Sequence, residues 1–338
     1  MKNLTLDDIA EMAGVSPATV SRVINNVVGT RSKARERVLQ VIEETGFQPH
    51  AAARSLASQQ SNVIGLLVPA PASRVLAHLY LLQLVEYISQ ACQNYDYVLS
   101  LFLTGDDTDE KKLLPKITRK GFVDGLIVRV FEGRRNEPLL QKLSHIGVPF
   151  VVSGRPSSPH QISYVAADNE RASYQAASHL ISLGRRRIVL LVGSLEPYHS
   201  QERLAGYRKA LDDRSLAFDE KLIAVEGVNG AYLTTQQLLP YQPDAIFMPT
   251  RVVLDVLRAL QQAGLRVPED VALVGFDDLP LAHQTDPPLT TMRQPMAAMG
   301  KRLVEILLDI IENGPSPARQ VIFEQELVIR ESCGALKV

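Results

Sequence analysis

The first 25 residues have the pattern of two short helices joined by a tight turn. Thr5 is a candidate N-cap, and Asp8, three residues later, completes a capping box. The apolar residues that follow recur at helical spacing, at Leu6, Ile9, Ala10 and Ala13. Gly14 suits a left-handed helix end, and Ser16 and Pro17 suit the N-cap and first position of a second helix. This pair predicts either a helix-turn-helix, whose second helix lies in the DNA major groove, or an ordinary helical hairpin.

The segments that follow favour the DNA-binding alternative. A third helical pattern runs from Ser32 to Glu44, and an alanine-rich stretch follows at 50–58. Of the seven basic residues among the first 60, five lie between positions 22 and 37, where Glu36 is the only acid. A basic face of this kind suits contacts with phosphates, although a solvated helix face has the same composition.

Residues 4–66 resemble the DNA-binding headpiece of the LacI/GalR family of bacterial transcription regulators. The resemblance rests on the stretches TLDDIAEMAGVSPATVSRVINN, KARERV, GFQPHAAARSLAS and SNVIGLLVP. It implies that Pro17, Ala18 and Arg22 read the bases, and Arg22 can donate two hydrogen bonds to one guanine. The expected DNA-binding residues are Thr5, Leu6, Ser16, Pro17, Ala18, Thr19, Ser21, Arg22, Asn25, Ala53 and Leu56. For Thr19 and Asn25, a local capping role is the alternative.

Residues 47–60 are expected to form a linker whose alanine-rich part is too short to be a stable isolated helix. In the family, the matching segment folds on operator DNA, and two copies lie in the minor groove. The residue that matches Leu56 then acts as an apolar wedge, whereas the alternative for Leu56 is packing onto the headpiece. The wedge requires two copies of the chain, which implies a homodimer and a palindromic DNA site.

From Val63 onward, the pattern changes to strands and helices in alternation. A chain of 338 residues is too long for one compact core. Two pairs of segments repeat weakly: 63–68 resembles 187–192, and 123–128 resembles 243–248. We therefore expect an α/β protein whose core holds two doubly wound parallel sheets in tandem.

The expected domains are a helix-turn-helix headpiece (1–46), a hinge linker (47–60) and a core (61–338). The family core resembles periplasmic sugar-binding proteins, and its chain crosses between two lobes three times. The resemblance places lobe one at about 61–161 and 293–322, and lobe two at about 162–290 and 323–338. We expect the crossings near 161–163, 289–293 and 320–325, and a final strand at 320–329.

In sheets of this kind, ligands bind beyond the carboxyl ends of the strands, and a cleft between lobes is the usual site. The resemblance implies an effector site formed by His78, Tyr80, Arg129, Asn169, Arg203, Asn229, Arg251 and Asp277. Arg203 matches the family arginine that grips the effector, and Asp277 matches a residue that bonds sugar hydroxyls.

The chain departs from the family at two places in this expected site. Many members have Asn-Pro-Phe-Phe where this chain has His-Leu-Tyr-Leu at 78–81, and Ala-Asn-Asp where it has Met-Pro-Thr-Arg at 248–251. Arg129 and Arg251 instead add positive charge. One hypothesis is an anionic effector, such as a sugar acid or sugar phosphate, because guanidinium pairs well with carboxylate and phosphate. The other is that these arginines pair with nearby acids.

Composition excludes several classes of protein. A hydrophobic content of 46% with 22% charged residues is typical of a soluble globular protein, and no apolar run is long enough to cross a bilayer. The N-terminus lacks an apolar signal sequence, so we expect a cytoplasmic protein with no membrane partner. Cys92 and Cys333 should then be reduced thiols. No Cys/His cluster has metal-ligand spacing, so neither a metal nor a cofactor is expected.

These observations predict a DNA-binding transcriptional regulator, a repressor, rather than an enzyme. Its affinity for palindromic operator DNA would depend on a sugar, sugar acid or sugar phosphate in the cleft. Two alternatives remain: a sugar-binding protein without a DNA function, and a sugar-acting enzyme with Asp277 and Asp278 as acid and base. The sequence does not identify the effector, the operator, the controlled genes or the direction of the response. It also does not distinguish a dimer from a tetramer.

Overall fold

The computed structural model describes residues 4–24, 32–47, 60–76, 78–105, 107–130, 136–159, 161–226, 230–315 and 317–335. The chain forms two compact units, Met1–Ser61 and Asn62–Val338. Four of the expected site residues lie outside the described residues: Asn25, Ala53, Leu56 and Asn229. Most of the expected linker also lies outside them.

The first unit contains the two predicted short helices and a third. Their bounds are α1 (Leu6–Ala13), α2 (Pro17–Ile24) and α3 (Ser32–Thr45). The capping box is present, because Thr5 N donates to Asp8 Oδ2 at 2.7 Å and Asp8 N donates to Thr5 Oγ1 at 3.3 Å. Gly14 has the predicted left-handed conformation, with φ 61°. The helices pack around buried residues that include Ile9, Val20 and Val38.

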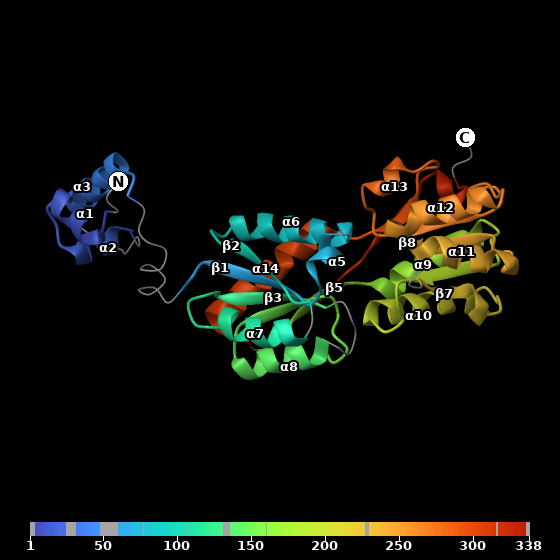
Figure 1. The fold of residues 1–338 in the computed structure, drawn as a ribbon, viewed down its shortest axis with the longest axis horizontal. Coiled ribbons are helices and arrows are strands. Elements are labelled where there is room, and N and C mark those ends of the chain that lie inside the picture. Colours follow the sequence, from blue (N-terminus) through green and yellow to red (C-terminus); the bar gives the residue numbers. More distant parts are fainter. Residues whose placement is uncertain are drawn as a thin grey trace. The chain divides into compact units, whose positions relative to one another are not determined.

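The second unit begins with a lobe built on a six-stranded parallel sheet of order β11-β5-β4-β3-β1-β2. Its strands are β1 (Val63–Val68), β2 (Val98–Leu103), β3 (Gly125–Arg129), β4 (Phe150–Ser153), β5 (Tyr164–Ala167) and β11 (Gln320–Phe323). The helices are α5 (Ala72–Leu76), α6 (Leu79–Gln93), α7 (Asp107–Ile117), α8 (Glu137–Ile146) and α14 (Met296–Asn313). Helices α6 and α14 cover one face of the sheet, and α7 and α8 cover the other (Figure 1).

Lobe two has a sheet of order β12-β10-β9-β8-β6-β7, in which only the β12–β10 pair is antiparallel. Its strands are β6 (Ile188–Val192), β7 (Ile223–Val225), β8 (Ala245–Pro249), β9 (Ala272–Phe276), β10 (Thr290–Arg293) and β12 (Glu326–Val328). The α-helices are α9 (Asn169–Ser182), α10 (Tyr198–Asp212), α11 (Gly230–Leu238), α12 (Val253–Gln262) and α13 (Leu281–Gln284). Short 3₁₀ helices are η2 (Glu220–Leu222), η3 (Leu239–Tyr241), η4 (Thr250–Val252) and η5 (Glu331–Cys333).

The two-sheet α/β architecture confirms the predicted fold class, and each sheet is buried on both faces. Helices α9 and α10 cover one face of the lobe-two sheet, and α11 and α12 cover the opposite face. The α9–α10 contact is very close at Gly206, where a Cβ atom would lie 2.0 Å from the carbonyl oxygen of Glu170. Only glycine therefore fits at this position.

The lobe boundaries differ from those expected. Strand β5 pairs with β4 and β11, so the chain crosses to lobe two after Ala167 and not near 161–163. Strand β10 pairs with β9, so lobe two continues through Arg293 before the second crossing. The expected single strand at 320–329 is two strands in different sheets, because the third crossing at Glu324 and Gln325 divides it.

Three further observations concern the described residues. Cys92 and Cys333 are both free and buried. No described helix combines the length and the apolar character that a membrane span requires. Within the same residues, no group of three or more His, Cys, Asp or Glu side chains is placed to hold a metal ion.

Candidate functional site

The second helix of the first unit exposes the residues expected to face DNA. Pro17, Ala18 and Arg22 are exposed on one side of α2, while Val20 and Val23 are buried on the other. This arrangement follows from the helical period, which places positions 18 and 22 on one face. A short, exposed, mostly uncharged helix face with one arginine suits the edges of bases in a groove.

The polar residues around α2 make local bonds. Thr19 N donates to Ser16 Oγ at 3.3 Å, and the two hydroxyls lie 2.9 Å apart. Ser16 therefore caps the start of α2, and the Thr19 hydroxyl lies within hydrogen-bond distance of the capping hydroxyl. Leu6 is half-buried against the core of this unit, and the Thr5 side chain belongs to the capping box.

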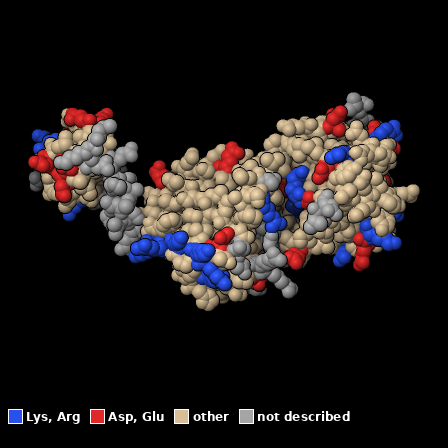
Figure 2. Space-filling view, viewed as in Figure 1, with Lys and Arg blue, Asp and Glu red and all other residues tan. Residues whose placement is uncertain are grey.

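The second unit has a cavity of about 410 Å³ lined by residues of both lobes. The structure brings together seven of the eight expected effector residues on its wall: His78, Tyr80, Arg129, Asn169, Arg203, Arg251 and Asp277. They lie at the carboxyl ends of parallel strands or within the first two turns of the helices that follow. This is where an open α/β sheet binds ligands. Figure 2 shows basic side chains on both sides of the junction between the lobes.

Arg203 lies on α10 and is only 8% exposed. Its Nε donates to Asn169 Oδ1 at 3.3 Å, and its guanidinium carbon lies 3.7 Å from the centre of the Phe276 ring. Burial lowers the pKa of Arg203 from its usual value, while the Asp277 carboxylate opposes this change. The stack and the hydrogen bond fix the plane of the guanidinium, so its remaining N–H groups have a defined direction.

Asp277 connects the two lobes through Gln294, a residue that the sequence analysis did not single out. Asp277 has φ 70°, an uncommon backbone conformation that Asp tolerates better than most residues. Gln294 Nε2 donates to Asp277 Oδ1 at 2.6 Å, and the Tyr80 hydroxyl donates to Gln294 Oε1 at 3.2 Å. Gln294 lies on the second crossing between β10 and α14, so this chain of bonds passes through a segment that joins the lobes.

Arg251 has an acidic partner. Its Nη1 donates to Glu226 Oε1 at 3.1 Å, and its Nη2 pairs with Glu226 Oε2. The fork of the guanidinium thus meets both carboxylate oxygens, which is the strong form of this ion pair. For Arg251, the alternative of pairing with a nearby acid is therefore correct.

Arg129 ends β3, and two of its contacts are with a backbone carbonyl and an aromatic ring. Its Nη1 donates to the carbonyl oxygen of Ser153 at 2.9 Å, and its guanidinium carbon lies 5.2 Å from the centre of the Tyr80 ring. Gly154 has φ 99°, and a Cβ atom there would lie 2.7 Å from Arg129 Nη1. Gly154 therefore gives Arg129 the space to reach the cavity.

Two histidines of the wall are kept neutral by their surroundings. Burial lowers the pKa of His78 to about 4, with Asp277 opposing and Arg251, Arg129 and Arg74 adding to the effect. The pKa of His199 is also well below its usual value, first because of burial and then because of Arg203 and Arg129. The electrostatic environment of this part of the wall thus disfavours additional positive charge.

Comparisons with known proteins identify the chain. Residues 5–50 match the model of the lacI family of bacterial regulatory proteins, and residues 177–333 match a periplasmic binding protein-like domain. The HTH-type transcriptional regulator CelR of Thermobifida fusca is 34% identical over 97% of this chain and 98% of its own length. The chain belongs to the LacI family.

Solved structures of LacI-family proteins have the same architecture. The CelR–cellobiose complex matches with a TM-score of 0.76 and 31% identity over 97% of this chain and 99% of that chain. The Lac repressor dimer bound to operator and the anti-inducer ONPF matches with a TM-score of 0.83 and 27% identity over 98% and 99%. This LacI-family chain is accordingly a DNA-binding transcriptional regulator, as predicted.

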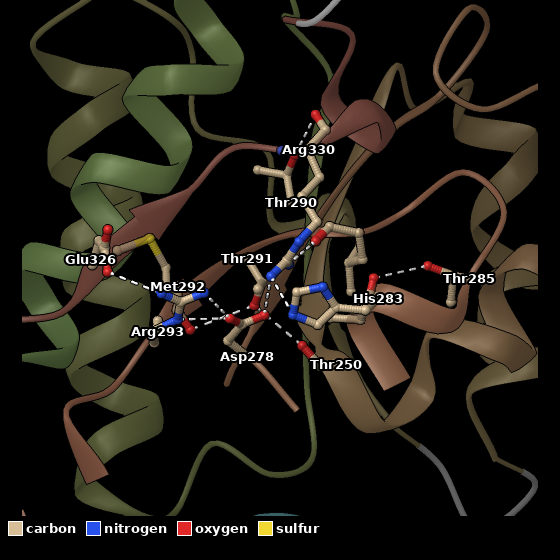
Figure 3. Close-up of polar contacts among 12 residues, drawn as sticks. Thr250, Asp278, His283, Thr285, Thr290, Thr291, Met292, Arg293, Glu326 and Arg330 are labelled. Carbon is tan, nitrogen blue, oxygen red and sulfur yellow. Dashed lines mark hydrogen bonds and ion pairs between the residues drawn. The ribbon is translucent and has the colours of Figure 1, made fainter. Parts of the chain in front are cut away.

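The acid–base alternative for Asp277 and Asp278 is not supported by their geometry. Asp277 lines the cavity, but Asp278 forms ion pairs with Arg293 at 2.7 Å and Arg330 at 2.8 Å. Figure 3 shows Asp278 between the two guanidinium groups, with His283 beside Arg330. The two neighbouring carboxylates therefore have different roles. The Asp277 carboxylate faces the cavity, and the Asp278 carboxylate is bound by two arginines.

The wall also contains residues that the sequence prediction missed. They are Arg74, Arg155, His199, Ser200, Glu226 and Gln294. Arg155 of lobe one forms an ion pair with Glu202 of lobe two at 3.0 Å. The position of His199 and Ser200, within one helical turn of Arg203, was the one local indication available. No local pattern marked Arg155, Glu226 or Gln294, because their partners lie on distant segments.

Proposed function

We propose that the protein is a dimeric repressor of transcription that binds a palindromic operator and responds to a sugar-like effector in the cleft. The observation that carries this proposal is the combination, in one chain, of a helix-turn-helix with an exposed reading face and a core whose cavity has polar walls from both lobes. A ligand held by both lobes has different contacts in different lobe orientations, which is the requirement for allosteric control.

At the operator, Arg22 would donate two hydrogen bonds to a guanine, while Pro17 and Ala18 would contact thymine methyl groups. Ser16 and Ser21, with Thr5, Leu6, Thr19 and Asn25, would fix the position of the headpiece on the DNA backbone. Ala53 and Leu56 of the linker would enter the minor groove as a pair, one copy from each protomer. The protein would act in the cytoplasm, where its DNA is located.

In the cleft, the effector would contact His78, Tyr80, Arg129, Asn169, Arg203, Asn229 and Asp277. CelR has been solved with cellobiose, and the Lac repressor as a dimer on operator DNA. By analogy, a sugar, sugar acid or sugar phosphate is the proposed effector class. Because coupling is reciprocal, operator DNA must change the affinity for effector by the same factor as effector changes the affinity for operator.

The test is a selection from random double-stranded DNA by the full-length protein, followed by binding measurements on the recovered sequence. We expect a palindrome, one dimer per site, and affinity that falls steeply with salt. Arg22→Ala should relax the preference at one base pair of each half-site, at a cost of about 1 to 3 kcal/mol. The matched control is Arg119→Ala, which also removes an arginine charge, but from the surface of the second unit and outside the headpiece. Recovery of unrelated sequences without a palindrome would contradict the proposal.

A further inference from the structure

The wall of the cavity is strongly basic. Within the residues that the structure describes, five arginines and two carboxylates line it: Arg74, Arg129, Arg155, Arg203 and Arg251, with Glu226 and Asp277. Two of these arginines form ion pairs that the structure describes. Arg251 is bound by both oxygens of Glu226, and Arg155 pairs with Glu202 just outside the wall. These two ion pairs leave little positive charge at their positions for a ligand to use.

Arg203 differs from Arg251 and Arg155. It is buried, and no carboxylate is within ion-pair distance of it in the described part of the chain. Its fixed contacts are the Asn169 side-chain oxygen, the Phe276 ring and a more distant electrostatic interaction with Asp277. A buried charge without a close counter-charge is costly to a folded protein. An anion supplied from solution would remove that cost and gain a charge-assisted hydrogen bond.

Arg129 approaches the same region from the other lobe. The Ser153 carbonyl and the Tyr80 ring hold its guanidinium in place, and Gly154 leaves room for it. Arg129 and Arg203 both lower the pKa of His199, so both exert their field on the same part of the cavity. The two cations therefore come from opposite lobes and repel each other across the cleft.

We propose that the effector carries an anionic group, a carboxylate or a phosphate, that bridges Arg129 of lobe one and Arg203 of lobe two. This inference depends on the proposed function, in which the cleft holds the effector. The bridging anion replaces the repulsion between the lobes with two attractions and so favours one lobe orientation. The hydroxyl groups of the same molecule then bind Asp277, Asn169 and Gln294, whose oxygens and amide groups suit neutral polar partners.

The test measures binding of matched neutral and acidic ligands to the full-length protein by thermal shift and calorimetry. The probes are glucose, gluconate and glucose 6-phosphate, and ribose with ribose 5-phosphate. We expect an acidic member of a series to bind at least about tenfold more tightly than its neutral counterpart, which corresponds to about 1.4 kcal/mol. The carboxylate and phosphate probes distinguish the two kinds of anion. The affinity for the acidic ligand should fall as ionic strength rises.

Variants assign the anion to its residues. Arg129→Gln should remove the preference for the acidic ligand, a loss of about tenfold or more in affinity. Arg203→Lys keeps the buried charge and avoids an unfolded variant, but it loses the planar fork and should also bind the acidic ligand less tightly. Arg119→Gln is the matched control, because it removes the same charge from an exposed position of lobe one that does not line the cavity. Its affinity should change by less than about threefold.

The outcomes separate this inference from the proposed function. Tight binding of a neutral sugar, unaffected by Arg129→Gln, would overturn the anion bridge and leave the regulator proposal intact. A loss of affinity in Arg119→Gln as large as that in Arg129→Gln would also overturn the assignment. If no neutral or acidic probe binds, while the selected operator still does, the sugar-like effector and the anion bridge both fail and the DNA-binding function stands.

Discussion

Asp278 and Arg330 form a buried ion pair in lobe two, where Arg330 Nη2 donates to Asp278 Oδ1 at 2.8 Å. Their side chains are only 4% and 10% exposed. Arg330 also donates to the Leu289 carbonyl and to His283 Nε2, so its charge is surrounded by acceptors. Asp278 in turn binds Arg293, the last residue of β10 before the second crossing (Figure 3). Within lobe two, this network joins the end of β10, which precedes the second crossing, to the segment after β12, which follows the third crossing.

Removal of the carboxylate from this network should destabilise the fold. We expect Asp278→Ala to lower the free energy of unfolding by about 3 to 5 kcal/mol, because it leaves the Arg330 charge buried and unpaired. Urea unfolding followed by circular dichroism measures this loss. The control is Glu324→Ala, which breaks the exposed pair with Arg171 and should leave stability nearly unchanged. Equal effects of the two variants would contradict the importance of burial.

Gly206 gives a prediction about packing. Gly206→Ala places a Cβ atom 2.0 Å from the carbonyl oxygen of Glu170, and backbone cannot move away as a flexible side chain would. We expect a loss of about 2 to 3 kcal/mol in the free energy of unfolding, with α9 and α10 forced apart. Ala205→Ser, at the preceding exposed position of α10, is the control and should have a small effect. A stable Gly206→Ala protein would show that α9 and α10 separate at little cost.

Local features of the sequence predicted local structure well. The capping box of Thr5, the left-handed Gly14 and the start of α2 at Pro17 each depend on neighbours within four residues. The long apolar run 63–68 likewise predicted a buried parallel strand, now β1. Such patterns are readable because the physical cause and the residue that carries it lie side by side in the chain.

The lobe crossings were harder to predict because they depend on distant pairing. Nothing within 320–329 separates β11 from β12, and only their partners β5 and β10 show that they belong to different sheets. Similarly, β5 is a four-residue strand whose lobe is set by β4 and β11. Short strands carry too little pattern to reveal which sheet they will join.

In the cleft, too, the residue positions could be predicted from the sequence, whereas their partners on distant segments could not. The family resemblance and the strand ends located Arg129, Arg203 and Asp277, which all line the cavity. The sequence could not show that Glu226 neutralises Arg251, because 25 residues separate the two along the chain. Gln294 was missed for a related reason: its bonds to Tyr80 and Asp277 exist only once the lobes are assembled. Partnerships across the fold, and not the residue types themselves, decide which charges a ligand meets.

The capping box gives a prediction for the headpiece. Thr5→Ala removes the hydroxyl that accepts from Asp8 N, and we expect the first unit to lose about 1 kcal/mol of stability. Hydrogen exchange of the α1 amides in the full-length protein should quicken, while exchange in the core stays the same. Thr5→Ser keeps the hydroxyl and should behave as the wild type does. Unchanged exchange in Thr5→Ala would mean that other contacts determine the stability of α1.

His78 makes stability depend on pH in a defined window. Its pKa is about 4 in the folded protein, lowered first by burial and further by Arg251, Arg129 and Arg74, with Asp277 opposing; an unperturbed histidine has 6.5. Between pH 4 and 6.5, the unfolded chain therefore binds more protons at this residue. Stability should fall as the pH decreases from 6.5 towards 4, by up to about 1.4 kcal/mol per pH unit from this group. Above pH 6.5, the contribution does not change.

The measurement compares urea unfolding of the wild type and His78→Gln at pH 7.5, 6.0 and 5.0. The difference between the two proteins isolates His78, because His179 and His199, whose pKa values are also lowered by burial, are present in both. We expect the wild type to lose more stability on acidification than the variant. An anionic ligand between Arg129 and Arg203 should reduce this difference, because negative charge near His78 raises its pKa towards the unfolded value. Parallel curves at all three pH values, with and without ligand, would show that His78 titrates alike in the folded and unfolded states.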